Sequence, residues 1–292
     1  MLKKLGMMLL AVSIGTLLSS CLVKKKSPDQ ITTFTSTTNQ LRIYQPFDTI
    51  YYNVQVDSAL SGSQSGTLQV EWRDTRQITD PLASPTQQYS VREETTTLSI
   101  SDGVGGTNDE QLVRYVEQDN ITGSLYLRAF PTQTRDVYYW LSPTNPPTSM
   151  LQRFEIFRSP LAMAGTIDLG AFYVASDCSD RQQCQISEAL AQSRLFTVTA
   201  INQTVDIPGT GIFKNAYRVK YDATTNRQAT APVFDILDVC GSLGNFTSTS
   251  HSATLDIVPE IGVIKMVNEC TDSASNSDVI YTATLDHTSF PY

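Results

Sequence analysis

Residues 204–221 read TVDIPGTGIFKNAYRVKY, and this stretch decides the fold class. From Tyr217 to Tyr221, large apolar side chains alternate with basic ones. A period of two is typical of a strand in a sheet with one buried face and one wet face. The proline and glycine at positions 208–209 favour a tight corner before this strand. The stretch therefore predicts two neighbouring β-strands joined by a turn.

The same alternation recurs on both sides of this stretch. Apolar residues occupy every second position over 50–56 and again over 68–72, after the serine- and glycine-rich stretch Ser61–Gly66. These two runs predict a hairpin with a long loop. Further strands are predicted over 89–100, 111–118, 124–130, 137–141, 153–158, 166–175, 195–203, 205–207, 213–221, 233–239, 254–258, 261–267 and 279–285.

The strand signals predict an all-β protein of antiparallel sandwich or curled-sheet modules. Proline-rich Ser142–Thr148 and the stretch Ser159–Gly165 are the candidate boundaries, which gives an N-terminal module over 41–158 and a C-terminal module over 159–292. A single short helix is expected over 186–193.

The first residues have the layout of a secretory signal peptide. Two lysines form a basic start, and the uncharged apolar run 5–18 follows. That run is shorter than the roughly 20 residues of a membrane-spanning helix. Leu18-Ser19-Ser20-Cys21 resembles the bacterial lipobox, which implies removal of 1–20 and attachment of diacylglycerol to Cys21. The residue after the cysteine is Leu22. An aspartate at this position would favour retention in the inner membrane, and its absence resembles lipoproteins that are forwarded to the outer membrane.

Residues 21–40 consist mostly of Lys, Ser, Thr, Asn and Gln and predict a disordered tether. The full chain has a net charge of −8. Loss of 1–20 removes two lysines and no acid, so that 19 basic residues face 29 acidic ones, a net charge of −10. This balance argues against a nucleic-acid partner. The expected partners are the membrane, through the lipid anchor, and another envelope protein.

Four cysteines remain after the anchor: Cys178, Cys184, Cys240 and Cys270. An even number in an exported chain indicates disulfides, and three pairings are possible. The most local arrangement, Cys178–Cys184 with Cys240–Cys270, is the one we expect. A zinc site that includes His251 is the alternative, but the close paired spacing of zinc ligands is absent. No metal or cofactor is predicted.

The turn at 208–209 belongs to a longer pattern. Thr204–Ala216 is followed by a strand and, about forty residues later, by Ile257–Lys265, which reads IVPEIGVIK. The pair resembles a pattern of uncharacterised bacterial envelope lipoproteins, although Glu260 replaces their usual glycine and the turn is one residue longer. The resemblance covers 204–265 and implies a curved antiparallel half-barrel, similar to the periplasmic lipoprotein-carrier fold. It implies no catalytic residue.

Candidate catalytic and metal-binding residues are few. His251 and His287 are the two histidines, and Gly62–Gly66 has glutamine at the centre, where a serine hydrolase needs serine. Asp102, Asp109 and Glu110 flank a glycine-rich loop without the spacing of an EF-hand. We therefore predict no catalytic residue and a protein that is not an enzyme.

Adjacent aromatic residues point to opposite faces of a strand in Tyr51-Tyr52 and Tyr138-Tyr139-Trp140. They indicate either a core on both sides or a binding face, where Tyr and Trp are favoured. The predicted function is non-enzymatic binding or scaffolding at the outer membrane by a lipid-anchored protein. The alternative is a carrier of lipid or lipoprotein, which needs an apolar cavity of roughly 300 Å³ or more.

Overall fold

The computed structural model describes residues 32–58, 62–80, 87–101, 103, 105–131, 138–142, 153–163, 165–168, 172–176, 185–226, 248–272 and 277–292. Within these ranges there is no helix, and so none that could cross a membrane. Residues from Ile31 to Tyr292 form one compact unit. Its strands are β1 (Thr33–Thr35), β2 (Thr49–Ser58), β3 (Gly62–Asp80), β4 (Gln87–Ser101), β5 (Thr107–Gln118), β6 (Leu125–Pro131), β7 (Tyr138–Ser142), β8 (Phe154–Phe157), β9 (Thr166–Asp168), β10 (Phe172–Ser176), β11 (Gln185–Ile207), β12 (Gly211–Asn226), β13 (Ser248–Val258), β14 (Gly262–Asp272) and β15 (Ser277–Thr288).

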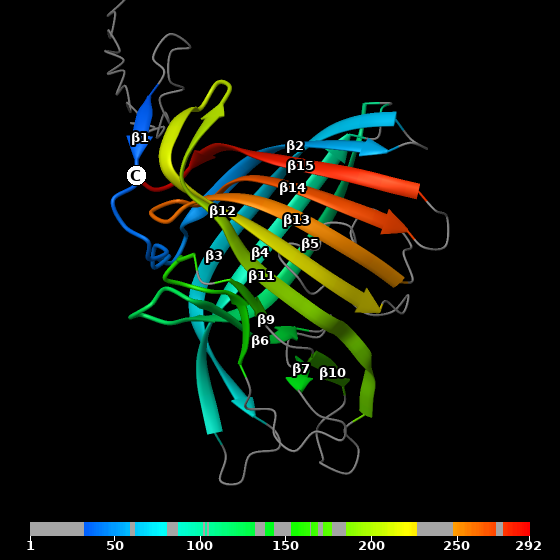
Figure 1. Ribbon diagram of the computed structural model, residues 1–292. Helices are drawn as coiled ribbons and strands as arrows, with labels where there is room; N and C mark the ends of the chain where they lie inside the picture. Colours follow the sequence, from blue (N-terminus) through cyan, green and yellow to red (C-terminus); the bar gives the residue numbers. More distant parts are fainter. Residues whose placement is uncertain are drawn as a thin grey trace, which may run out of the picture. The chain divides into compact units, whose positions relative to one another are not determined.

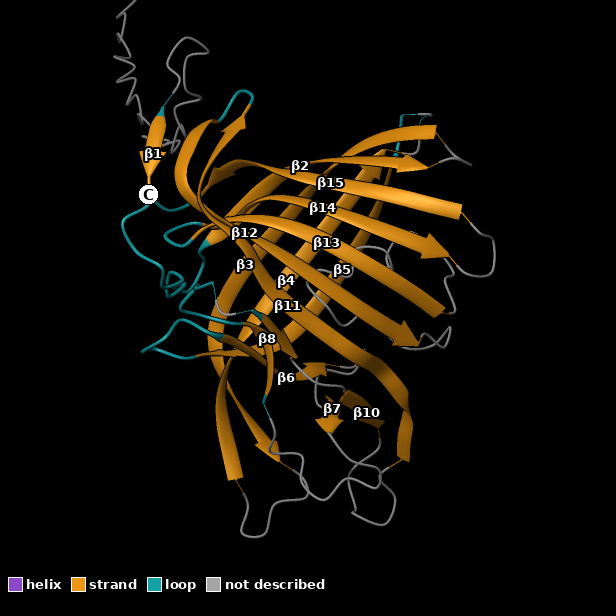
Figure 2. Ribbon diagram, in the orientation of Figure 1, coloured by secondary structure: helices purple, strands orange, loops and turns teal. Residues whose placement is uncertain are grey.

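The strands form one curled sheet (Figure 1). β2 to β6 follow one another as a meander, β12 to β15 form a second meander, and β15 pairs with β2. β12 lies near one end of the strand order and β10 near the other. β11 pairs with both of them, so the sheet curls back on itself. The pairings are antiparallel except that of β1 with β12. The predicted all-β class and the curled antiparallel half-barrel are confirmed (Figure 2).

Alternation along the strands determines which side chains fill the interior of the curl. Val219 of β12 lies between Val198 of β11 and Leu255 of β13, and all three are buried. Arg218 and Lys220, its neighbours in the chain, are exposed. The pattern predicted from Tyr217 to Tyr221 is therefore that of a strand with one buried face, as expected.

Two glycines stand where the backbone has a positive φ, and the first of them forms the corner predicted at 208–209. Gly209 follows Pro208 with φ +82°, and the Thr210 amide donates to the Ile207 carbonyl at 3.0 Å, as in a type II turn. Gly262 begins β14 with φ +114°, and a Cβ there would lie 2.4 Å from the hydroxyl of Tyr44. Glycine is therefore required at 262 both by backbone conformation and by space.

The helix predicted over 186–193 is wrong, because this stretch is the beginning of β11. Ala189 and Ala191 pair with β10, and from Ala191 onward β11 also pairs with β12. Hydrogen bonds to strands distant in the chain outweigh the local helical preference of alanine, leucine and glutamate. The long loop predicted over Ser61–Gly66 is also shorter, since 62–66 pair with β2. A Cβ at position 66 would lie 2.1 Å from the Ser99 carbonyl oxygen, which is too close. Glycine therefore fits this position in the strand.

Residues 32–40, the last part of the predicted tether over 21–40, lie within the compact unit. Phe34 of β1 lies 5.6 Å from the Tyr292 ring and 6.5 Å from the Phe213 ring, measured between centroids. Beyond β1, the hydroxyl of Ser36 and the amide of Thr37 donate to the Glu260 carboxylate at 2.6 and 2.8 Å. A few aromatic and polar contacts order a stretch whose composition resembles that of a disordered segment.

Strands of the two predicted modules, 41–158 and 159–292, are hydrogen-bonded to each other within one sheet. β15 pairs with β2 over Val279–Thr288, and β10 pairs with β7. We expect a chain of residues 159–292 alone to be insoluble or unfolded, because β15 would expose an edge that β2 normally covers. Circular dichroism and size-exclusion chromatography, with a 32–292 chain as the folded control, measure this. A monomeric and cooperatively melting 159–292 chain would show that the second module folds independently.

Candidate functional site

The sheet forks where β4 leaves β5. β4 pairs with β5 from Arg92 to Ser101, whereas Gln87–Val91 continue beside β3 alone. At the same level, Glu117 and Gln118 of β5 pair with β6. The β3–β4 hairpin therefore extends past the rest of the sheet, as Figure 1 shows. A hollow lies between the two branches.

This hollow, which we call the fork pocket, has a volume of about 440 Å³. That volume is within the roughly 300–1,000 Å³ of small-molecule sites. Hydroxyl, amide and guanidinium groups dominate its walls, with two aromatic rings among them. The lining residues are Ile43, Trp72, Thr75, Gln88, Tyr89, Ser90, Val91, Arg92, Val116, Glu117, Gln118, Asn120, Leu125 and Arg128.

Arg92 lies at the base of the fork, opposite Val116. Its Nη1 donates to the backbone carbonyl of Tyr44, while its Nε has no hydrogen-bond partner. Of the arginine side chains that the structure describes, it alone lacks a carboxylate within 4.0 Å. Burial lowers the pKa of Arg92 and the charge of Asp48 opposes this, but a guanidinium stays protonated at any physiological pH. Arg92 is thus a half-buried cation that no carboxylate neutralises.

A second arginine and the pocket's carboxylate lie on the β5–β6 branch. Arg128 Nε donates to Glu117 Oε2 at 2.7 Å, and its guanidinium lies 4.5 Å from the centroid of the Tyr89 ring. Arg153 Nη1 donates to the other oxygen of Glu117 at 2.9 Å. Because two arginines share Glu117, little of its charge is left to offset Arg92. The pocket is therefore positive, although the chain as a whole is negative.

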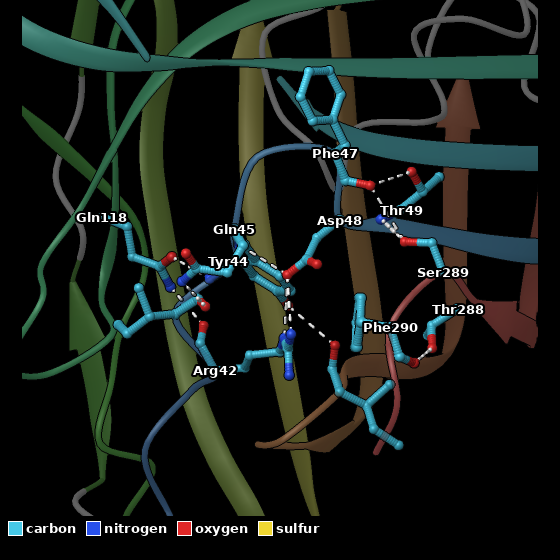
Figure 3. Close-up of polar contacts among 12 residues, drawn as sticks. Arg42, Tyr44, Gln45, Phe47, Asp48, Thr49, Gln118, Thr288, Ser289 and Phe290 are labelled. Atoms are coloured by element: carbon cyan, nitrogen blue, oxygen red, sulfur yellow. Dashed lines mark hydrogen bonds and ion pairs between the residues drawn. The ribbon is translucent and has the colours of Figure 1, made fainter. Parts of the chain in front are cut away.

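The segment from Arg42 to Asp48, of which Ile43 lines the fork pocket, is held in place by polar contacts (Figure 3). Gln118 accepts from the Tyr44 amide at 3.0 Å and donates to the Arg42 carbonyl at 2.8 Å. Asp48 accepts from the Arg42 guanidinium at 3.2 Å and from the Gln45 amide at 2.8 Å. The Tyr44 ring stacks on Trp72 at a centroid distance of 3.7 Å. These contacts hold the backbone on both sides of the Tyr44 carbonyl that receives Arg92.

The interior of the curl contains a smaller hollow of about 60 Å³. Its lining is apolar apart from the indole N–H of Trp72, which has no hydrogen-bond partner, and two tyrosine hydroxyls. Both hydroxyls are hydrogen-bonded: Tyr52 donates to the Val263 carbonyl at 2.9 Å and Tyr44 to the Ile261 carbonyl at 3.3 Å. Burial raises the pKa of Tyr44 and of Tyr52, which keeps both hydroxyls protonated. An occupant of this size would be a few atoms, not an acyl chain.

An ion pair is buried on the same face of the sheet. Glu94 of β4 lies opposite Arg114 of β5, next to Trp72 of β3, and both charged side chains are fully buried. Arg114 Nε donates to Glu94 Oε1 at 2.7 Å. Glu94 Oε2 and Arg114 Nη1 have no partner. The pair is closed to solvent, which makes it a structural element and not an exposed site.

The predicted covalent sites fall mostly outside the described residues. Cys21, Cys178, Cys184 and Cys240 all lie there, so the lipid attachment and the Cys178–Cys184 disulfide stay predictions. Cys270 is on β14, opposite His251 on β13, but neither side chain is described. The Cys240–Cys270 pairing likewise stays a prediction.

His287 is exposed on the outer face of the sheet. Its ring stacks on Tyr51 at 4.3 Å, and its Nδ1 lies 2.8 Å from Asp286 Oδ2. Neither the fork pocket nor the interior hollow includes it. Tyr52, by contrast, points into the interior, so adjacent Tyr51 and Tyr52 face opposite sides as predicted.

Other candidates from the sequence give no site. The side chains of Tyr138, Tyr139 and Trp140 lie outside the described part. Among the described residues, no three acidic, histidine or cysteine side chains form a group that could hold a metal ion. The acidic loop keeps only Asp109 as a described, exposed side chain, since Asp102 and the side chain of Glu110 are outside that part.

The patterns in the sequence do not predict the fork pocket. Arg92 stands in an apparently ordinary polar stretch, Arg92-Glu93-Glu94, within a predicted strand. Arg128 is on a different strand, and only the parting of β4 from β5 brings the two to one hollow. The one signal in the sequence was the polar, strand-like run before Arg92. This run extends β4 beyond the residues that pair with β5.

No family model matches the sequence, and no curated protein matches it. Two solved structures are similar. One is an exported protein with a YmcC-like fold from Bacteroides fragilis NCTC 9343, with 12% identity and a TM-score of 0.36, covering 86% of this chain and 99% of that one. The other is a lipoprotein from Parabacteroides distasonis ATCC 8503, with 12% identity and a TM-score of 0.33, covering 87% of this chain and 99% of that one. The curled sheet described above is assigned from the strand pairing of this chain itself.

Proposed function

We propose that this chain is a lipid-anchored protein of the bacterial outer membrane that binds a ligand or partner at the fork pocket without catalysing a reaction. The observation that carries the proposal is the contrast between the two hollows. The fork pocket is polar and about 440 Å³, whereas the apolar interior holds about 60 Å³. The envelope location is supported by the leader and lipobox-like motif that end at Cys21.

The contrast also separates this proposal from the carrier alternative. A carrier would hold an acyl chain in the interior of the curl, where the described residues leave a hollow well below the roughly 300 Å³ that a ligand site needs. The side chains of Val219, Leu255 and Leu285 are fully buried, which indicates a packed core in the interior of the curl. Interior side chains therefore stabilise the sheet in this proposal, and the rim of the sheet does the binding.

Position-specific photocrosslinking in intact cells tests the proposal. A photoreactive residue at Ser90, on the fork pocket wall, should give an adduct. The same residue at Ile280, exposed on β15 and remote from the pocket lining, should give none and is the matched control. An adduct at 280 but not at 90, or none at either position, would contradict binding at the fork.

Native mass spectrometry of the acylated chain from envelopes tests the carrier alternative. We expect no lipid beyond the covalent anchor. A stoichiometric lipid that is lost on Leu68→Phe, which would fill the interior hollow, would overturn the proposal in favour of a carrier.

The anchor has its own test. We expect Cys21→Ser to release the mature protein into the soluble periplasmic fraction, because no other segment of the sequence is apolar enough to hold it. Fractionation and immunoblotting after a high-salt wash measure the release, with the unsubstituted chain as control. A substituted protein that stays with washed membranes would refute attachment through Cys21.

A further inference from the structure

The fork pocket has a charge that its own lining does not neutralise. Two arginines, Arg92 and Arg128, reach it, and its lining carboxylate, Glu117, is engaged by Arg128 and Arg153. Placing an unpaired cation in a partly buried position costs free energy, which native proteins offset with a paired anion. At Arg92 the described residues supply no carboxylate within 4.0 Å, and Asp48 acts on it only from a greater distance.

The rest of the lining can bind a small polar molecule around that charge. The ring of Tyr89 forms one side, and Gln88, Ser90 and Thr75 offer amide and hydroxyl groups from the β3–β4 branch. An arginine guanidinium binds carboxylate and phosphate oxygens through charge-assisted hydrogen bonds. Nη1 of Arg92 is held by the Tyr44 carbonyl, so the orientation of the guanidinium is set before any ligand arrives.

We propose that the fork pocket binds a small polar molecule through a carboxylate or phosphate group, which Arg92 and Arg128 hold. This inference rests on the proposed function, since it names the chemistry of the ligand at the same pocket. The planar carboxylate and the tetrahedral phosphate both carry negatively charged oxygens that a guanidinium recognises. A neutral molecule of the same size would leave Arg92 unpaired.

Calorimetric titration of the full chain with three matched probes tests the inference. Glucuronate and glucose 6-phosphate carry the two anions on the same ring as glucose, which carries none. We expect one or both acids to bind at least about tenfold more tightly than glucose, since hydrogen bonds to charged groups are the stronger ones. Raising the salt concentration should weaken the acids and leave glucose unchanged. The tighter of the two acids identifies carboxylate or phosphate as the group recognised.

Two substitutions place the effect at the pocket. Arg92→Gln should lower the affinity for the acids about tenfold or more, while Lys214→Gln, an equal loss of charge at an exposed position on β12, should not. Gln88→Glu adds a negative charge at an exposed lining residue and should also weaken the acids. It disturbs no buried group, so it remains informative if Arg92→Gln fails to fold.

Three results would overturn the inference: equal binding of glucose and both acids, no saturable binding of either acid in the millimolar range, or acid binding that neither Arg92→Gln nor Gln88→Glu changes. The photocrosslinking result at Ser90 tests the proposed function independently of these titrations. An adduct at Ser90 in cells together with no acid binding would leave the fork pocket as a binding site and remove only its preference for an anion.

Discussion

Val219→Asp is expected to unfold the protein. Val219 is fully buried and lies in register with Val198 and Leu255, so an aspartate there would be surrounded by apolar side chains. An uncompensated buried carboxylate costs about 3–5 kcal/mol, a large part of the roughly 5–15 kcal/mol that stabilises a typical domain. Urea unfolding followed by circular dichroism measures the loss. At neutral pH we expect no cooperative transition.

Ile201→Asp is the matched control for this effect. Ile201 lies on neighbouring β11, and 42% of its surface is exposed. The same exchange of an apolar side chain for aspartate should change the free energy of unfolding by no more than about 0.5 kcal/mol at an exposed site. A Val219→Asp protein that melts like the Ile201→Asp protein would mean that this face of β12 is not packed, and would return the interior to consideration as a ligand groove.

The second large effect is expected at the buried ion pair. Arg114→Met leaves Glu94 fully buried and without Arg114, its ion-pair partner in the described part of the chain. Breaking such a pair from one side costs about 3–5 kcal/mol. Chemical denaturation should therefore show a clearly lower midpoint with an unchanged slope.

The double substitution Glu94→Leu with Arg114→Met separates charge from packing. Both replacements are apolar and of similar volume, and removing a buried pair together is often neutral or stabilising. We expect the double variant to recover most of the stability that Arg114→Met loses. If it is as unstable as the single variant, the side chains stabilise the sheet through shape and not through the balance of charge.

The sequence predicts the strands well where one face is buried and the other is wet. The alternation from Tyr217 to Tyr221 and over 50–56 identifies β12 and β2, and Pro208-Gly209 marks the corner before β12. Such local patterns report the environment of each side chain directly. They do not report which strands are neighbours, and the pairing of β15 with β2 could not be read from them.

The errors and omissions share a physical cause. Residues 186–193 contain good helix formers, but strands distant in the chain pair with them. Glu94 and Arg114 look like solvated charges in the sequence, although each is fully buried beside the other. Arg92 and Arg128 become one site only because two hairpins part. In each case the deciding interaction joins residues far apart in the chain, which composition and periodicity do not contain.

Because β1 pairs with β12, the stretch of chain that would connect Cys21 to the folded unit is short. A chain that became ordered only at Leu41 would leave about twenty residues after Cys21, with a reach of at most about 70 Å. Since the folded unit already holds Phe34, Ser36 and Thr37, only the ten residues 22–31 separate Cys21 from Thr32. Their fully extended length is at most about 40 Å, whatever conformation they adopt. For a chain acylated at Cys21, this confines the β1 edge of the sheet to a thin layer next to the membrane surface and restricts the partners that it can meet.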